Sequence, residues 1–193
     1  MKREKIYSLF RKNPSLTLFN KTYIDNDGNE QVSEQWLSDG FSGYVLENLP
    51  IFNEITLEAL IGVPTDYPTN YTVLPIPNFL KNCIDDSDDD AIINLCKSQY
   101  HIFDYSVLEV DDDKIPERCF FINNDFLKPF SDDCEYTFYA KKIAHGKYAI
   151  IVKAGFIVKG ITFPIDFAER NINSKIKFAE LVTAELSKYI KTE

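Results

Sequence analysis

The sequence lacks any apolar run that approaches the roughly 20 residues a membrane-spanning helix needs. Its first apolar stretch, residues 6–10, is also too short for a secretory signal, because Arg11 and Lys12 follow it directly. Both absences favour a cytoplasmic protein with no membrane partner.

Sequence motifs of catalysis and metal binding are missing as well. There is no GxSxG elbow, no P-loop and no GxGxxG turn. The 4 cysteines form no CxxC pair, which predicts reduced, buried thiols instead of a disulfide framework. His101 and His145 have no ligand residue at metal spacing, so a half-buried strand position and an exposed turn are expected for them. We therefore expect no catalytic residue, no metal and no cofactor, with an enzyme of unrecognised type as an open alternative.

Acidic residues outnumber basic ones and are partly clustered. The 30 Asp and Glu face 21 Lys and Arg, which gives a formal charge of -9. This balance argues against indiscriminate nucleic-acid binding but allows a local basic face. The aspartates of residues 85–90 suggest a calcium loop, yet with Asp86 as its first ligand the required glycine and glutamate are replaced by Ala91 and Lys97. The run is therefore interpreted as a solvated turn.

The chain has the apolar content of a folded protein, with 45% hydrophobic residues that include 15 Phe and 11 Tyr. The first part predicts a short helix at residues 3–12 and three strands joined by tight turns at residues 25–28 and 38–40. These strands are expected at residues 16–24, 31–37 and 41–46. The proline-punctuated residues 50–75 are expected to form an irregular connector, with one or two helical turns within residues 52–61.

Two later stretches resemble each other. Residues 78–81 read Asn-Phe-Leu-Lys and lead to Ser-Asp-Asp, and residues 125–128 read Asp-Phe-Leu-Lys and lead to the same tripeptide. Each is expected to open a unit of one short helix and three strands, because self-similarity is typical of a reused supersecondary unit. The expected helices lie at residues 78–84 and 123–130, and the expected strands at residues 91–96, 100–110, 117–122, 134–143, 147–153 and 156–163.

The predicted fold class is α+β, with repeated αβββ units and a mainly antiparallel sheet, because the turns between strands are short. Apolar residues at helical spacing in residues 173–191 predict a closing C-terminal amphipathic helix. In this division, residues 1–72 form the first unit with its connector. Residues 73–193 form two further units and the closing helix.

Several short stretches, in this order, resemble bacterial and phage DNA sliding clamps, the β subunit of the replicative polymerase and its viral relatives. Ser38-Asp39-Gly40 matches a strand-turn-strand motif of that family, and residues 74–81 are similar to its proline-led strand and helix. Residues 121–127 and 160–166 are similar to the opening and the end of its last unit. The sequence departs from the family at Phe41, where histidine is usual, and at Asp166, where arginine is usual.

The resemblance implies a clamp-like βαβββ fold and a non-catalytic processivity or scaffold protein, of phage or mobile-element type. Such a protein would act in replication or recombination, as an oligomer, with DNA and a replication or recombination protein as partners. DNA would be held by sequence-independent phosphate contacts from basic side chains. The candidates for these contacts are Lys2, Arg3, Lys5, Arg11, Lys12, Lys81 and Lys128.

A second hypothesis assigns the acidic surface the leading role. The aspartates of residues 85–90, 111–113 and 132–133 would then mimic DNA and occupy the basic site of a nucleic-acid enzyme, as in a counter-defence protein. An inhibitor of this kind binds no DNA itself, whereas a clamp-like scaffold does.

Overall fold

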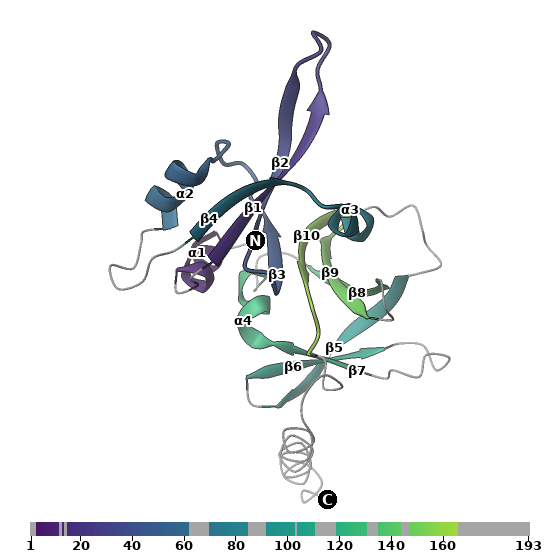
Figure 1. Cartoon of the computed structure of the whole chain (residues 1–193). Coiled ribbons are helices and arrows are strands. Elements are labelled where there is room, and N and C mark those ends of the chain that lie inside the picture. Colours follow the sequence, from purple (N-terminus) through teal and green to yellow (C-terminus); the bar gives the residue numbers. More distant parts are fainter. Residues whose placement is uncertain are drawn as a thin grey trace, which may run out of the picture.

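In the computed structural model, the described residues are 3–11, 13, 15–61, 70–84, 92–102, 104–110, 119–130, 135–143 and 147–165 (Figure 1). Their helical segments are α1 (Arg3–Phe10), α2 (Glu54–Ile61), α3 (Asn78–Ile84), α4 (Asn124–Leu127) and the 3-10 turn η2 (Lys128–Phe130). Their first strands are β1 (Ser15–Ile24), β2 (Glu30–Ser38), β3 (Ser42–Val45), β4 (Asn70–Pro75) and β5 (Ile92–Ile102). The later strands are β6 (Tyr105–Val110), β7 (Cys119–Asn123), β8 (Thr137–Lys142), β9 (Tyr148–Ala154) and β10 (Ile157–Thr162).

These strands form one 10-stranded sheet in the order β4-β1-β2-β3-β10-β9-β8-β5-β6-β7. Every neighbouring pair is antiparallel except β1 and β4, which run parallel. The α+β class with a mainly antiparallel sheet is thus confirmed. The expected closing helix at residues 173–191 lies outside the described residues.

The sheet keeps consecutive strands together in groups of three. β1 to β3, β5 to β7 and β8 to β10 are each neighbours in chain order, and the groups are joined by the pairs β3 with β10 and β5 with β8. Among the described elements, a short helix comes before the first strand of each group. The repeated, clamp-like αβββ units expected from the sequence stay a prediction. The expected domain boundary, between residues 72 and 73, falls within β4.

Two segments differ from the sequence-based expectation. Residues 70–75 were expected to be irregular, but they form β4, which lies at the edge of the sheet and pairs with β1 from Ser15↔Asn70 to Asn20↔Pro75. An edge strand tolerates a proline at its end, so the prolines of this segment did not exclude a strand.

The second difference concerns β5. The turn expected between residues 96 and 100 instead comes after Ile102, and β5 continues through an irregularity in its pairing between Lys97 and His101.

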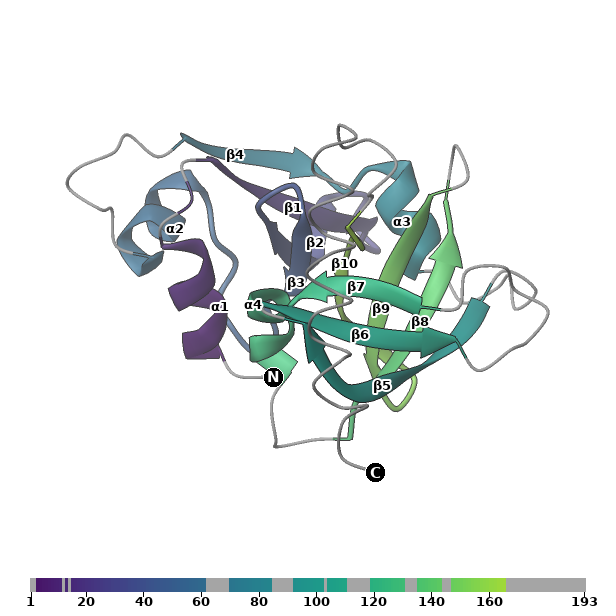
Figure 2. The same cartoon turned by 90° about the horizontal axis from the view of Figure 1, so that it is seen from below.

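The centre of the sheet is buried on both faces. Along β9, Ile150 and Val152 belong to one apolar cluster, while Ala149 and Ile151 belong to another, as the alternation of a strand requires. The first cluster contains residues of α1, α2 and α4, and the second contains Leu80 and Cys83 of α3. The helices therefore cover opposite faces, and Figure 2 shows α1, α2 and α4 grouped apart from α3.

Tyr44 of β3 connects the strands to the helices of the first cluster. Its ring lies between Phe10 of α1, at 5.6 Å between centroids, and Phe130 of η2, at 5.5 Å. Its hydroxyl donates a hydrogen bond to the carbonyl oxygen of Phe126 at 2.7 Å. Burial raises the pKa of this hydroxyl, so it stays protonated and remains a donor.

Glycine at position 160 makes room for this cluster. A Cβ atom on Gly160 would lie 2.3 Å from the ring of Phe130 and 3.2 Å from the carbonyl oxygen of Gly43. A Cβ atom on Gly43, in the neighbouring strand, would find its closest contact at an ordinary 3.7 Å.

We predict that Gly160→Ala lowers the free energy of unfolding by about 1–3 kcal/mol, because the methyl group overpacks the site of Phe130. Gly43→Ala is the matched control and should cost less. Urea denaturation of both variants measures the difference. Adding Phe130→Leu to Gly160→Ala should recover part of the loss, and equal stability of the two glycine variants would contradict the packing described.

Candidate nucleic-acid interface

The cations predicted from the sequence are divided between the two faces of the sheet. Lys5 and Arg11 are exposed in and just after α1, and the exposed Lys128 lies in η2, against which α1 packs. Lys81 is exposed on α3, on the opposite face. Lys2 and Lys12 lie outside the described residues, and only the backbone of Arg3 is described. The predicted set therefore does not form one surface.

The α1 side also carries acids. Lys128 forms an ion pair with Asp125 one turn earlier, and Glu4 is exposed on α1 beside Lys5. Solvent-exposed pairs of this kind contribute little stability, but they reduce the local positive potential. Only a weak attraction for phosphate is expected on this side from the described side chains.

The face that carries α3 is more basic. Strand alternation places Lys141 on the side of Tyr139 and Lys153 on the side of Ile151, and both of these neighbours pack at the α3 cluster. Lys21 lies on the same side as Phe19, two residues earlier in β1, and Lys81 projects from α3 itself. We call the set Lys21, Lys81, Lys141 and Lys153 the lysine face.

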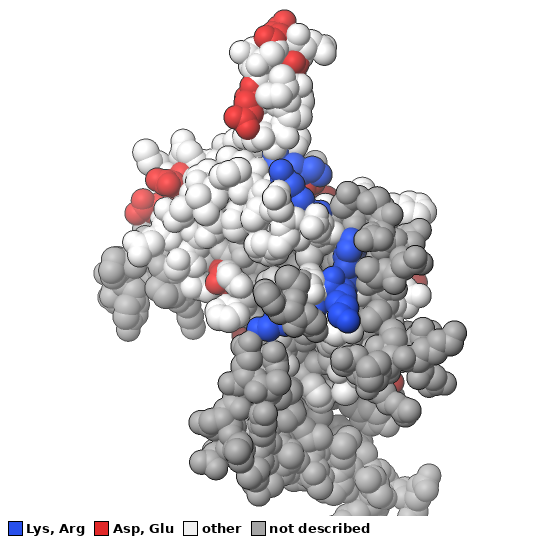
Figure 3. All heavy atoms as spheres, turned by 45° about the vertical axis from the view of Figure 1, so that its right-hand side comes forward, with Lys and Arg blue, Asp and Glu red and all other residues white. Residues whose placement is uncertain are grey.

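Figure 3 shows the basic atoms gathered in the middle of this side of the molecule. The acidic atoms in that view lie on the β1–β2 hairpin and toward the left and right edges, with a few beside the basic atoms. No acidic residue occurs in α3, β8, β9 or β10. Glu34 is the acid nearest to Lys21 in the sheet register, and its carboxylate accepts a hydrogen bond from Trp36 Nε1 at 2.6 Å. The aspartates of residues 85–90 follow α3 in sequence and lie outside the described residues.

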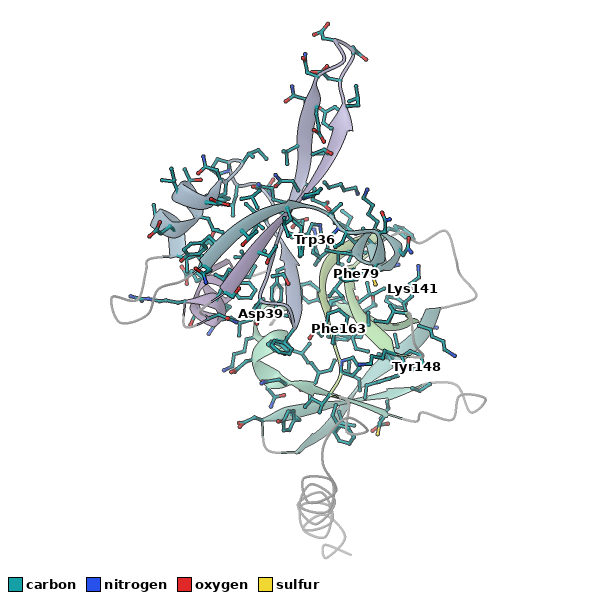
Figure 4. All side chains as sticks on the ribbon, in the orientation of Figure 1. Trp36, Asp39, Phe79, Lys141, Tyr148 and Phe163 are labelled. Carbon is teal, nitrogen blue, oxygen red and sulfur yellow. The ribbon has the colours of Figure 1, made fainter. Side chains whose placement is uncertain are left out.

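Lys141 holds the end of α3. Its side chain is buried, and its Nζ donates a hydrogen bond to the carbonyl oxygen of Asn82 at 2.6 Å. Carbonyl groups at the C-terminal end of a helix lack partners within the helix and carry partial negative charge, so a lysine there is favourable. In Figure 4, Lys141 lies beside α3, on the side away from Trp36.

Lys153 occupies a different position on the same face. It is only 8% exposed, and its Nζ lies 5.0 Å from the centre of the Tyr139 ring, which fits a cation–π contact. Asn94 of β5 is exposed and pairs with Tyr139 in the sheet register. The face thus combines ammonium groups with a neighbouring aromatic ring and an amide, which suits an anionic ligand.

Lys21, Lys141 and Lys153 were missed by the sequence analysis. The candidates predicted from the sequence were the basic residues near the N-terminus and the single lysines of two short helices, whereas Lys21, Lys141 and Lys153 come from separate strands. The alternation of Tyr139 with Lys141 in a predicted strand was the one local signal. Their burial follows from the packing of α3, which no local pattern reveals.

The described residues also include titratable groups outside the lysine face. They contain no group of three or more His, Cys, Asp or Glu side chains that could hold a metal ion. Cys83 lies on the buried side of α3, and burial raises the pKa of its thiol. The charge of Lys141 lowers that pKa by a smaller amount. A hollow of about 170 Å³ lies between α1 and residues 45–49, and its one acid, Glu47, forms an ion pair with Lys159. The side chain of His101 and all of His145 lie outside the described residues.

Comparisons with protein-family models, with curated proteins and with solved structures found no match. Within the described part of the chain, no helix has the length and apolar character needed to cross a membrane. The lysine face is therefore argued from its own geometry and charge.

We predict that Lys141→Met lowers the free energy of unfolding by about 1.5–3 kcal/mol, the range for a hydrogen bond to a charged group. The methionine keeps the length of the side chain but cannot donate to Asn82. Lys142→Met removes an exposed charge at the next residue and should change stability by less than about 0.5 kcal/mol. Urea denaturation gives both values, and faster amide exchange in α3 of the first variant alone would locate the effect. Equal losses in the two variants would show that the charge at 141 has no structural role.

Proposed function

We propose that the protein is a non-catalytic, DNA-associating scaffold of sliding-clamp-like build that acts in the cytoplasm in replication or recombination. The observation that carries this proposal is the gathering of lysines on a molecule of net negative charge, from β1, α3, β8 and β9, which contain no acid. The contact would be to phosphates, so it would be independent of base sequence.

The exposed cations of this face are the ones that can reach a phosphate. Lys81 and Lys21 are exposed to solvent. Lys141 and Lys153 are buried, and their charges add to the positive potential at the surface of the same face. Each phosphate that a lysine neutralises releases counterions, so binding should weaken as salt rises. Binding through so few exposed lysines should be weak at one site and strengthened in an oligomer, where several copies contact one duplex.

The clamp-like part of the proposal is supported by the sequence resemblance and by the order of the strands. Three groups of three strands, each preceded by a short helix, follow one another in the chain. The helices α1 and η2 of two such groups are in contact on one face. The oligomer, its replication or recombination partner and the phage or mobile-element origin belong to the same proposal.

A matched pair of double variants tests where DNA is held. Lys21→Ala with Lys81→Ala removes two exposed cations from the lysine face, and Lys5→Ala with Arg11→Ala removes two from the α1 side. Binding of a mixed-sequence duplex is measured against salt concentration. The first variant should reduce the slope of log affinity against log salt by about 1.8, at about 0.9 for each lost phosphate contact, and the second should leave it near the original.

Both variants have the same net charge, so a general loss of positive charge affects them equally. A larger loss in the α1 variant would place the contact on the helices that the sequence resemblance favoured. An unmutated protein that retains no duplex at low salt would refute DNA association altogether.

A second candidate function is the acidic interaction protein, and one structural feature favours it. The β1–β2 hairpin projects from the body in Figure 1, and its residues 22–32 include Asp25, Asp27 and Glu30 but no Lys or Arg. Such an arm could enter a basic site of a nucleic-acid enzyme. This reading requires that the protein binds a basic partner and no DNA.

A further inference from the structure

The hairpin of β1 and β2 is the most prominent feature that the proposed scaffold function leaves without a role. Residues 21–34 are exposed or half-buried throughout, and the buried core begins only at Gln35 and Leu18. Lys21 lies at the base of the hairpin, on the lysine face, and at about 3.3 Å per residue the strand segment from Thr22 to Asp25 extends roughly 10 Å beyond it. An isolated two-stranded hairpin is marginally stable in water, so such an extension needs a specific turn or a partner.

The turn of the hairpin is held by hydrogen bonds to the Asp25 carboxylate. The Asp25 carboxylate accepts hydrogen bonds from the backbone N–H groups of Asp27 and Asn29, at 3.0 and 2.8 Å, and from the Gln31 amide at 3.1 Å. The bond from Asn29 is the main cause that holds the pKa of Asp25 below its usual range, so this carboxylate is charged at neutral pH. Gly28 supplies the left-handed conformation, with φ of 83°, that the turn requires. The hairpin therefore presents a fixed tip.

The tip exposes apolar side chains as well as acids. Tyr23 is 52% exposed and Ile24 is 67% exposed, next to the exposed Asp27 and Glu30. Neighbouring apolar and acidic groups on a rigid projection are typical of a protein contact surface. Burial of the apolar side chains supplies most of the binding free energy in such a contact. The acidic side chains fix how the two partners are positioned.

We propose that this hairpin docks on the lysine face of a second copy of the chain. The two surfaces are complementary in charge, since the tip carries acids and no cation between Thr22 and Val32, and the receiving face carries lysines without an acid in α3, β8 or β9. The receiving face also has an exposed aromatic side chain, Phe79 of α3, which is 50% exposed and can pack on Tyr23 or Ile24.

Geometry favours contact between molecules over contact within one. The strands of the hairpin are paired as far as Ile24 with Glu30, and they continue directly into the central sheet, so the tip cannot fold back onto its own α3. DNA is a poor occupant for the tip, because its acids face the phosphates with like charge. The receiving surface differs from the docking surface, so the contact is head-to-tail and generates a ring if the rotation closes.

This inference rests on the lysine face of the proposed function and gives that face a second ligand. A docked hairpin would cover Lys81, so a second copy and DNA would compete for the same cations. Assembly should then be strongest without DNA at low salt, and it should weaken as salt screens the charges, with a Debye length of about 10 Å at 0.1 M.

A charge-swap experiment on the full chain tests the contact. The hairpin variant is Asp27→Lys with Glu30→Lys, which leaves the Asp25 turn intact, and the face variant is Lys21→Glu with Lys81→Glu. The combined variant carries all four changes and has the net charge of the original chain. Sedimentation equilibrium without DNA, at about 50 mM salt, gives the association constant of each.

Each two-residue variant should associate at least about tenfold more weakly than the original, because like charges then meet across the contact. The combined variant should recover to within about threefold, because the charges are complementary again. Tyr23→Ser with Ile24→Ser should weaken association without changing any charge. Unchanged amide protection at Asn29 in all variants would show that the hairpin itself is folded.

A protein that remains monomeric in the micromolar range, or a combined variant as weak as the sum of its parts, would overturn the inference. Binding of the hairpin to a basic foreign protein in the absence of self-association would also overturn it, in favour of the acidic interaction protein. The proposed function fails separately. If the charge-swap result is obtained but the original protein retains no duplex, DNA association is refuted while the contact between copies stands.

Discussion

Tyr44 lies where three separate parts of the chain meet. Its ring contacts Phe10 of α1 and Phe130 of η2, and its hydroxyl bonds to the Phe126 carbonyl of α4, while the strand that carries it pairs with β2 and β10. The pair of β3 with β10 joins the first three strands to the rest of the sheet. Loss of this cluster would therefore separate the hairpin-bearing strands from those that carry Lys141 and Lys153.

The centre of the sheet is buried on both faces, so polar side chains that could contact a ligand lie toward its edges and strand ends. β9 is covered from both sides, by the Tyr44 cluster and by α3, so its polar side chains are confined to its ends. The buried Lys153 lies near one such end, and Lys141 of β8 supports the end of α3. The positive charge of Lys141 and Lys153 is thus fixed by the same packing that holds the core, whereas the exposed β1–β2 hairpin carries Asp27 and Glu30.

Local patterns predicted most of the elements, and tertiary contacts explain what they missed. The Asp-Gly-type turn at residues 25–28 and the helix at residues 78–84 depend on neighbours in sequence, so both were found. β4 depends on its pairing with β1, which no local signal encodes. The candidate interface was harder still, because burial of Lys141 and Lys153 depends on α3 packing across strands distant in sequence. The basic residues nearest the N-terminus were the obvious candidates, but the described ones lie on a face shared with acids.

The central claim is that polyanions meet this molecule at the lysine face. Amide chemical-shift mapping during titration with a short mixed-sequence DNA duplex tests it most directly, since each backbone N–H reports its own environment. The account predicts salt-sensitive shifts in α3, at the ends of β8 and β9 and around Lys21, with α1 and η2 unaffected. Shifts concentrated in α1 and η2, or no shifts at low salt, would contradict it.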